Sequence, residues 1–146
     1  RQMNILGIAL ATLAAFLIGF ALFNGKTLYP VWYRAMGKEM PTRPEVMTDA
    51  DKREAGIMFG STFASQIGQA IVMSWLIDTF DKAYGGMNPL FGALVGIVLG
   101  LGISGFSSLS HRLFSGQGFK VWAIEIFGDV VALAAMGAIL GAFYLG

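Results

Sequence analysis

The chain has no cysteine, and this absence excludes several kinds of chemistry at once. It leaves no disulfide, no thiolate nucleophile and no cysteine ligand for a metal. Histidine is nearly absent as well, because His111 is the only one in 146 residues, and one imidazole cannot build a histidine metal centre. We find no paired nucleophile and base, no phosphate-binding loop and no metal-ligand spacing. We therefore expect a protein that is not an enzyme, with no metal and no indicated cofactor.

Charge is also scarce, since only 13% of the residues are charged and the formal net charge is +1. A chain with so small a positive excess gives no indication of nucleic-acid binding. Hydrophobic residues make up 55%, and the mean hydropathy is +0.65, far above that of an ordinary water-soluble domain. We therefore expect one integral membrane domain over residues 1–146, with the lipid bilayer as its first partner.

Four apolar segments are long enough to cross a bilayer as helices. Thr48 with Asp51 predicts a capping box at the start of the second helix, and Asn88-Pro89 predicts the start of the third. The first segment is too long for a typical cleaved signal peptide, so we expect it to be retained. The predicted spans cover residues 4–23, 55–80, 89–109 and 119–145, and the second helix begins in water near residue 49.

A shorter amphipathic segment lies between the first two spans. Leu28, Trp32 and Met36 recur at intervals of four, beside Tyr33 and Arg34. This pattern is typical of a helix at the membrane interface, with Trp32, Tyr33 and Arg34 as its anchor. The predicted fold class is therefore all-α, a bundle of four transmembrane helices with a short interfacial amphipathic helix between helices 1 and 2. We expect two prolines to end the interfacial helix: Pro41 and Pro44.

The distribution of lysine and arginine predicts the orientation. Eight of these residues fall in the first and third connections, and two fall on the opposite side. Because basic loops stay in the cytoplasm, we expect both termini to face outward. The eight are Lys26, Arg34, Lys38, Arg43, Lys52, Arg53, Arg112 and Lys120, and the two are Arg1 and Lys82.

Small residues recur at intervals of four and predict close helix packing. We favour packing within this chain; the alternative is that one ridge serves a partner protein or a second copy. The glycines concerned are Gly56, Gly60, Gly68, Gly92, Gly96, Gly100, Gly137 and Gly141.

Two acidic residues stand inside the last apolar segment. Glu125 and Asp129 are four residues apart and share one helix face, opposite which Gln66 and Gln69 come at comparable depth. We expect the acids to face protein rather than lipid, with a hydrogen bond between Asp129 and Gln66 geometrically plausible. Either the acids are protonated and hydrogen-bonded as packing contacts, which we favour, or they form a proton or cation site.

Several stretches resemble a bacterial family of small integral membrane proteins known as domain of unknown function 1761. The likeness extends over nearly the whole chain in segment order, starting from the alanine-rich first segment. It implies a multi-pass helical protein of the bacterial inner membrane, and it implies no activity. The matching residues are Trp32, Arg34 and Gly37 in LYPVWYRAMG, Leu113, Phe114, Gly116, Lys120 and Ile124 in LFSGQGFKVWAIE, and the ending MGAILGAF over residues 136–143.

Two functional hypotheses from different classes follow. The first is a non-catalytic accessory or structural subunit that packs against a larger membrane complex, possibly a bioenergetic one. The second is a small proton- or cation-coupled carrier that uses the intramembrane carboxylates Glu125 and Asp129.

Overall fold

The computed structural model describes residues 4–39 and 46–145, and within these residues the chain is helical without strands. This confirms the all-α class. Pro41, Pro44 and Arg43 lie outside the described residues. The elements are α1 (Ile5–Leu22), α2 (Leu28–Ala35), α3 (Asp49–Tyr84), α4 (Pro89–Leu99), the π-helix η1 (Gly100–Gly105), α5 (Phe106–Phe114) and α6 (Gly118–Ala142).

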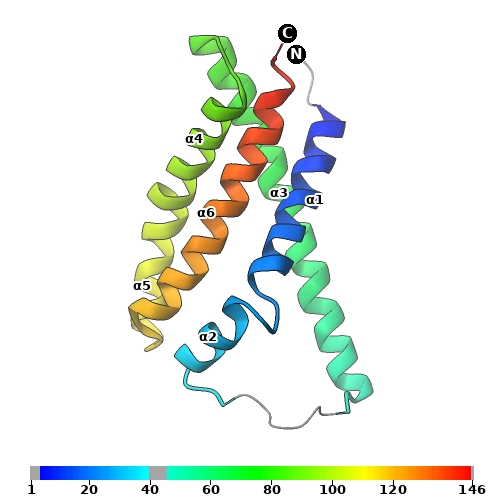
Figure 1. The fold of residues 1–146 in the computed structure, drawn as a ribbon, viewed down its shortest axis with the longest axis vertical. Helices are drawn as coiled ribbons and strands as arrows, with labels where there is room; N and C mark the ends of the chain where they lie inside the picture. Colours follow the sequence, from blue (N-terminus) through cyan, green and yellow to red (C-terminus); the bar gives the residue numbers. More distant parts are fainter. Residues whose placement is uncertain (1–3, 40–45, 146) are drawn as a thin grey trace.

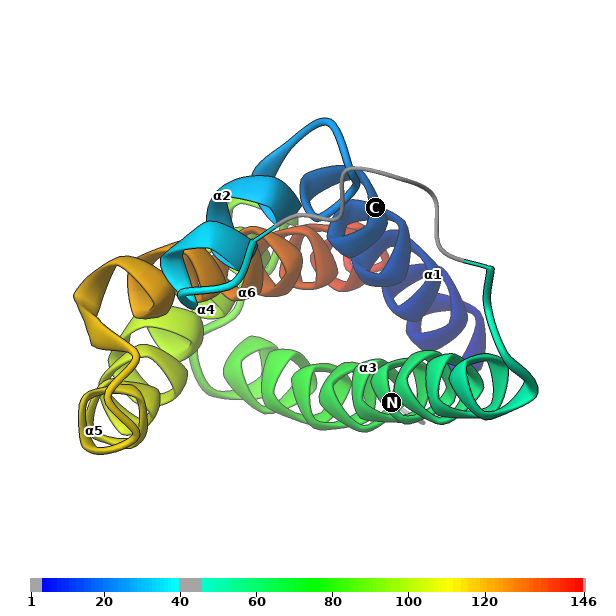
Figure 2. The ribbon, with the colours of Figure 1, turned by 90° about the horizontal axis from the view of Figure 1, so that it is seen from below.

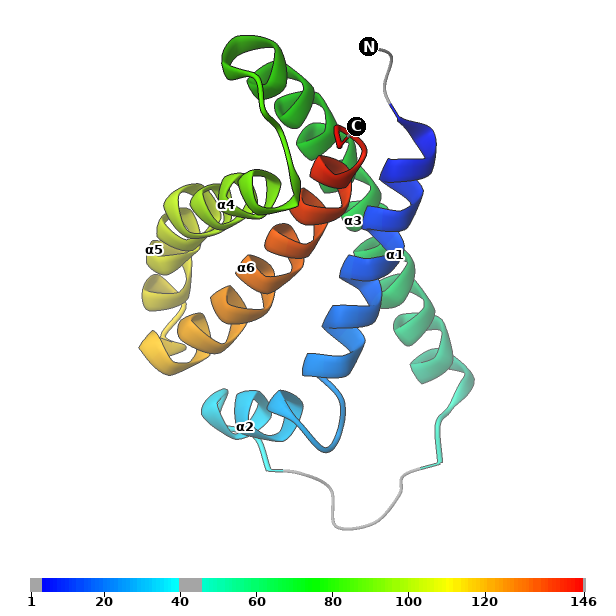
Figure 3. The same ribbon diagram turned by 45° about the horizontal axis from the view of Figure 1, so that its top comes forward.

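The long helices alternate in direction around α6 (Figure 1). The short α2, the turn between α5 and α6 and the beginning of α3 lie at one end of the molecule. The beginning of α1, the connection between α3 and α4 and the end of α6 lie at the other end. Figure 3 shows α6 between α4–α5 on one side and α1 on the other, with α3 crossing behind. The helix that carries Glu125 and Asp129 is therefore the central one.

Among the described residues, three helices are long and apolar enough to cross a membrane, which is typical of a membrane protein. They are α1, the continuous helical stretch Pro89–Phe114, and α6. The second predicted span lies within α3, which has 36 residues but is interrupted by polar side chains, so its apolar content is too low to place it among the three.

Side-chain caps fix the helix starts that the sequence predicts. The Thr48 hydroxyl accepts a hydrogen bond from the Asp51 backbone N–H, and the Asp51 carboxylate accepts one from the Thr48 backbone N–H. The Thr48 backbone N–H and the Thr48 hydroxyl both donate to the Asp51 carboxylate, and these two hydrogen bonds hold the pKa of Asp51 below its usual range. The Asn88 side chain accepts from the Phe91 backbone N–H at 2.9 Å, with Pro89 as the first helical residue. Both predicted helix starts are confirmed.

Glycine lets α4 and α6 pack backbone to backbone. A Cβ atom added at Gly92 would lie 1.9 Å from the Gly137 carbonyl oxygen, and one added at Gly96 would lie 2.1 Å from that of Leu133. At Gly141 a Cβ would lie 2.4 Å from the Asn88 carbonyl oxygen. No side chain fits at such distances, so the ridges of these two helices are the contact between them.

The glycine ridge of α3 behaves differently. A Cβ added at Gly56, Gly60 or Gly68 would meet no other described atom within 4 Å. The expectation that every ridge packs within the chain is therefore wrong for these three glycines of α3. Figure 2 shows α3 along one edge of the bundle, so one face of this helix is turned away from the other helices.

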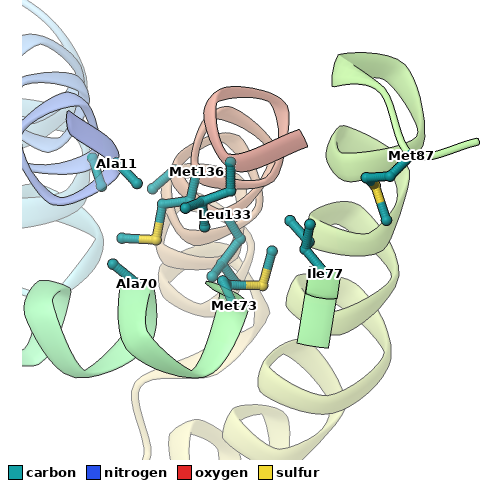
Figure 4. Packing of buried hydrophobic residues seen from close by; sticks show 10 residues of the cluster. Ala11, Ala70, Met73, Ile77, Met87, Leu133 and Met136 are labelled. Carbon is teal, nitrogen blue, oxygen red and sulfur yellow. The ribbon is translucent and has the colours of Figure 1, made fainter. Parts of the chain in front are cut away.

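The buried core lies where α1, α3 and α6 meet. Met73 of α3 packs beside Leu133 of α6, and Met136 reaches toward Ala11 and Ala70 (Figure 4). This contact holds α3 against α6 at residues 70–77, so the parts of both helices nearer to α2 are free to diverge. The cluster comprises Ala11, Ala15, Ala70, Met73, Ile77, Met87, Ala132, Leu133, Met136 and Leu140.

Candidate functional site

Asp129 lies near the middle of α6, one turn before the core residue Leu133. Its side chain is exposed and lines two separate clefts, both of which are also lined by residues of α3. Within residues 4–39 and 46–145 its carboxylate has no hydrogen-bond or ion-pair partner. The expectation that Asp129 faces other helices of the bundle therefore agrees with its position.

The larger cleft, called here the serine-lined cleft, lies between α3 and the helical stretch from α4 to α5. Its volume is about 670 Å³. Ser104, Ser107, Ser108 and His111 lie along one wall, on one face of their helix. Ser65 and Gln69 lie on the α3 wall. The full lining is Ser65, Gly68, Gln69, Val72, Met73, Leu76, Leu99, Ile103, Ser104, Ser107, Ser108, His111, Asp129 and Leu133.

The smaller cleft, called here the phenylalanine-lined cleft, lies between α1, α3 and α6 and has a volume of about 310 Å³. The Phe23 ring closes against Gly128, where an added Cβ would lie 2.6 Å from a ring carbon. Polar atoms here come from Thr62, Gln66 and Asp129. The remaining lining residues are Ala15, Phe16, Gly19, Phe20, Phe59 and Ala132.

The expected hydrogen bond between Asp129 and Gln66 is not formed. The Gln66 Oε1 atom is buried and has no partner among the described residues. Gln69 donates instead to Ser65 on its own helix, at 3.1 Å. Gln66 lies beyond the Ala70 contact, where α3 and α6 are separated by the phenylalanine-lined cleft, so Gln66 and Asp129 share a cleft without touching.

Glu125 has a different environment from Asp129. Its carboxylate accepts two hydrogen bonds from the Arg112 guanidinium, at 2.7 and 2.6 Å, and a third from the Trp32 indole N–H at 2.9 Å. Arg112 also donates to the Gln117 side chain. Because an arginine pair of this geometry is strong and directional, Glu125 is already neutralised and serves to join α2, α5 and α6. We call Trp32, Arg112, Gln117 and Glu125 the arginine cluster.

The arginine cluster also changes the expected role of the interfacial anchor. The Trp32 indole N–H points to protein, whereas Arg34 is exposed in the last turn of α2. The Tyr33 ring lies 5.6 Å from that of Tyr29 and 5.5 Å from the Lys38 ammonium. The α2 helix is thus held to the bundle by Trp32, and its other side carries the basic and aromatic groups.

Sequence reasoning missed Arg112 and the serine row, and a signal was available for each. Arg112 and Glu125 flank the short turn at Gly116, so antiparallel helices would bring them together. Ser104, Ser107, Ser108 and His111 have the spacing of one helix face, a row that would otherwise be read as a solvated surface.

A π-helix lies beside the serine row. Residues Gly100–Gly105 form it, and the Trp122 indole N–H donates to the Gly105 carbonyl at 2.8 Å. Because π-helical segments leave backbone carbonyls without their usual partners and often mark functional positions, this contact satisfies one such carbonyl from α6. The segment turns Ser104 toward the cleft while Gly100 stays against Val130.

In the described part of the chain, no three histidine, aspartate or glutamate side chains lie close enough together to hold a metal ion. The arrangement offers instead one unpaired carboxylate between two clefts.

A family comparison places this architecture. The model of the family described as protein of unknown function, DUF1761, matches residues 6–141. The chain belongs to this family. No curated protein and no solved structure matches it. Two stretches that carry the family resemblance meet in this DUF1761 protein, because Trp32 of the first contacts Glu125 at the end of the second. Membership of this family assigns no activity to the chain.

Proposed function

We propose that this protein is a small membrane carrier in which Asp129 binds a proton or a cationic group. The observation that carries the proposal is the position of Asp129, whose side chain lines clefts on both sides of the α3–α6 pair. An unpaired carboxylate inside an apolar helix bundle is costly as a bare anion, so it takes up a proton or a cation. Access from two clefts allows that group to arrive by one and leave by the other.

The neighbouring acid supports the same assignment by contrast. Glu125 is held by Arg112 and Trp32, so it is not free to bind another cation. We therefore assign the binding role to Asp129 alone, and a joining role to Glu125. This narrows the hypothesis from the sequence, which treated the two carboxylates together.

The carrier requires α3 to cross the membrane as a fourth span. We propose this crossing because α3 runs from the end of the bundle that holds α2 to the end that holds the α3–α4 connection, as the other long helices do in alternate directions (Figure 1). The polar side chains that lower its apolar content, Ser65, Gln66 and Gln69, line the two clefts rather than lipid alone. We further propose the bacterial inner membrane, with both termini outside the cytoplasm, from the distribution of basic residues.

Proton flux into proteoliposomes tests the carrier proposal. We expect Asp129→Asn to abolish pH-driven flux while the protein still folds, because the amide keeps the shape of the side chain and loses its proton and its charge. Asp81→Asn is the matched control, because the Asp81 side chain accepts a hydrogen bond from the Met87 backbone N–H and an amide oxygen can still accept it. Equal flux through wild type and Asp129→Asn would overturn the proposal.

One observation favours the accessory-subunit hypothesis as a second candidate. The α3 ridge at Gly56, Gly60 and Gly68 has open space beside it, which is suited to close approach of another helix. Purification in mild detergent followed by native mass determination separates the candidates. Large partners at fixed stoichiometry favour the subunit hypothesis, and a single chain or homo-oligomer favours the carrier.

A further inference from the structure

The serine-lined cleft is larger than a site for a proton, the simplest cation that an isolated carboxylate can bind, would need to be. A proton needs no cavity, and the cleft has a volume of about 670 Å³, which lies in the range of small-molecule sites. A calcium site in a protein combines several carboxylates with neutral oxygens, and this lining supplies only one carboxylate. The size and the donor set both favour an organic molecule.

The lining is graded along the bundle axis. Because α3 and α6 run in one direction and α4–α5 in the other, Leu76, Leu99 and Leu133 lie toward the end that holds the α3–α4 connection. The polar groups, including Ser65, Asp129 and the serine row, lie toward α2 and α5. A ligand that fills this cleft has an apolar body and a polar head at the level of Asp129.

The charges on the lining decide the sign of that head. Asp129 is the only acidic residue among the lining residues, and none of them is lysine or arginine. His111 is the other titratable side chain there, and it is exposed at the far end. The nearby Arg112 is already paired with Glu125. The polar end of the cleft is therefore negative, and it favours a cation over an anion.

Oxygen acceptors without a hydrogen-bond donor among the described residues line the same cleft as Asp129. The Ser104 and Ser107 hydroxyls make no side-chain hydrogen bond within the described part of the chain, and the Gln69 amide uses only its N–H group. An ammonium group has up to three N–H donors, so it can pair with the carboxylate and use neutral oxygens as well. We propose that the serine-lined cleft binds an amphipathic organic ammonium ion, with its amine on Asp129 and its apolar body against Leu76, Leu99 and Leu133.

This inference rests on the proposed function and names the class of its cargo. The probe is 1-naphthylmethylammonium, and 1-naphthylmethanol is its uncharged counterpart of the same shape. Binding to the full chain in detergent is measured by calorimetry, with the signal of empty micelles subtracted. We expect saturable binding of the amine, and binding of the alcohol at least roughly tenfold weaker, because a charged hydrogen bond contributes about 1.5–3 kcal/mol.

Three variants and one control locate the site. Asp129→Asn should weaken amine binding roughly tenfold or more. Gly68→Leu places a side chain into the cleft from a position with no atom within 4 Å, and it should also abolish saturable binding. Gly60→Leu is the matched control, because it adds the same side chain to open space on the same helix away from the cleft and should leave binding unchanged. Val72→Trp fills the cleft from a second position if Gly68→Leu does not fold.

The outcomes separate this inference from the proposed function. Equal affinity for the amine and the alcohol, no saturable amine binding, or full binding by a folded Gly68→Leu or Val72→Trp variant would overturn the cargo assignment. If Asp129→Asn still abolishes proton flux in that case, the carrier proposal stands without this cargo. If amine binding depends on Asp129 but flux does not, the cleft is a binding site and the carrier proposal falls.

Discussion

Two acidic residues on one helix have different surroundings in this protein, although they are four positions apart. Glu125 is paired with Arg112 and accepts a bond from Trp32, whereas Asp129 has no partner among the described residues. The sequence shows that both acids lie inside an apolar segment, because that follows from composition. It could not separate them, since the partners of Glu125 come from α2 and from the far side of a turn.

Removing the charge of Glu125 should cost stability. We expect Glu125→Gln to destabilise the folded state by about 1–3 kcal/mol, because the half-buried Arg112 loses its counterion. Urea or dodecyl sulfate titration of the purified protein in micelles, followed by circular dichroism, measures the change. The double variant Arg112→Gln with Glu125→Gln should recover part of the loss. A single variant as stable as wild type would show that the arginine cluster does not hold α2 to the bundle.

Removing the polar group of Asp129 should have the opposite result. Asp129→Leu breaks no hydrogen bond within the described residues, so we expect its unfolding free energy in the same titration to equal or exceed that of wild type. If Asp129 were a packing contact, the same change would orphan a partner and cost about 1–2 kcal/mol. A loss of that size would support the interpretation that Asp129 is a packing contact.

At the scale of helices, glycine ridges with the same spacing lead to different contacts. Those of α4 and α6 meet backbone to backbone, and that of α3 faces open space. The spacing of the glycines predicts that one face of a helix has no side chains, and it does not predict which helix packs against that face. Helix starts are predictable because Thr48 and Asn88 act on the next few residues. The π-helix is not, because the contact at Gly105 comes from Trp122 on another helix.

The two kinds of ridge predict a matched pair of variants. Gly96→Leu forces a side chain against the Leu133 carbonyl, where even a Cβ would lie at 2.1 Å, so we expect a loss of about 3 kcal/mol or no folded protein. Gly60→Leu adds the same side chain to open space and should change stability by less than about 1 kcal/mol. Thermal unfolding of both variants in one detergent compares them. Equal losses would contradict the packing of α4 on α6.

At the scale of the whole molecule, the number of helices that cross the membrane determines on which side of it each end of the bundle lies. In the part of the chain that the structure describes, three helices have the length and composition of membrane spans, and α3 has the length with more polar residues. The lengths of the apolar segments and the capping residues predict the all-helical class and the order of the segments. They could not predict the clefts, because the walls of the clefts come from helices that are far apart in the sequence and that only the folded chain brings together.

Accessibility of single cysteines tests whether α3 crosses the membrane. The chain has no native cysteine, so each variant carries one thiol. Lys38→Cys and Tyr84→Cys are exposed positions at opposite ends of the molecule and avoid glycines with positive φ such as Gly37 and Gly85. An impermeant maleimide should label position 84 in intact cells and position 38 in inverted vesicles only. Labelling of both positions from one side would contradict four spans.

The account depends most on Asp129 being a reachable carboxyl that exchanges a proton for a cation. A hydrophobic carbodiimide modifies a protonated carboxyl in an apolar setting, and peptide mass spectrometry locates the modified residue. We predict modification at Asp129 and none at Glu125, slower labelling as the pH rises, and protection by 1-naphthylmethylammonium but not by 1-naphthylmethanol. Modification at Glu125 in place of Asp129, or labelling of Asp129 that neither pH nor the ammonium probe alters, would contradict the account.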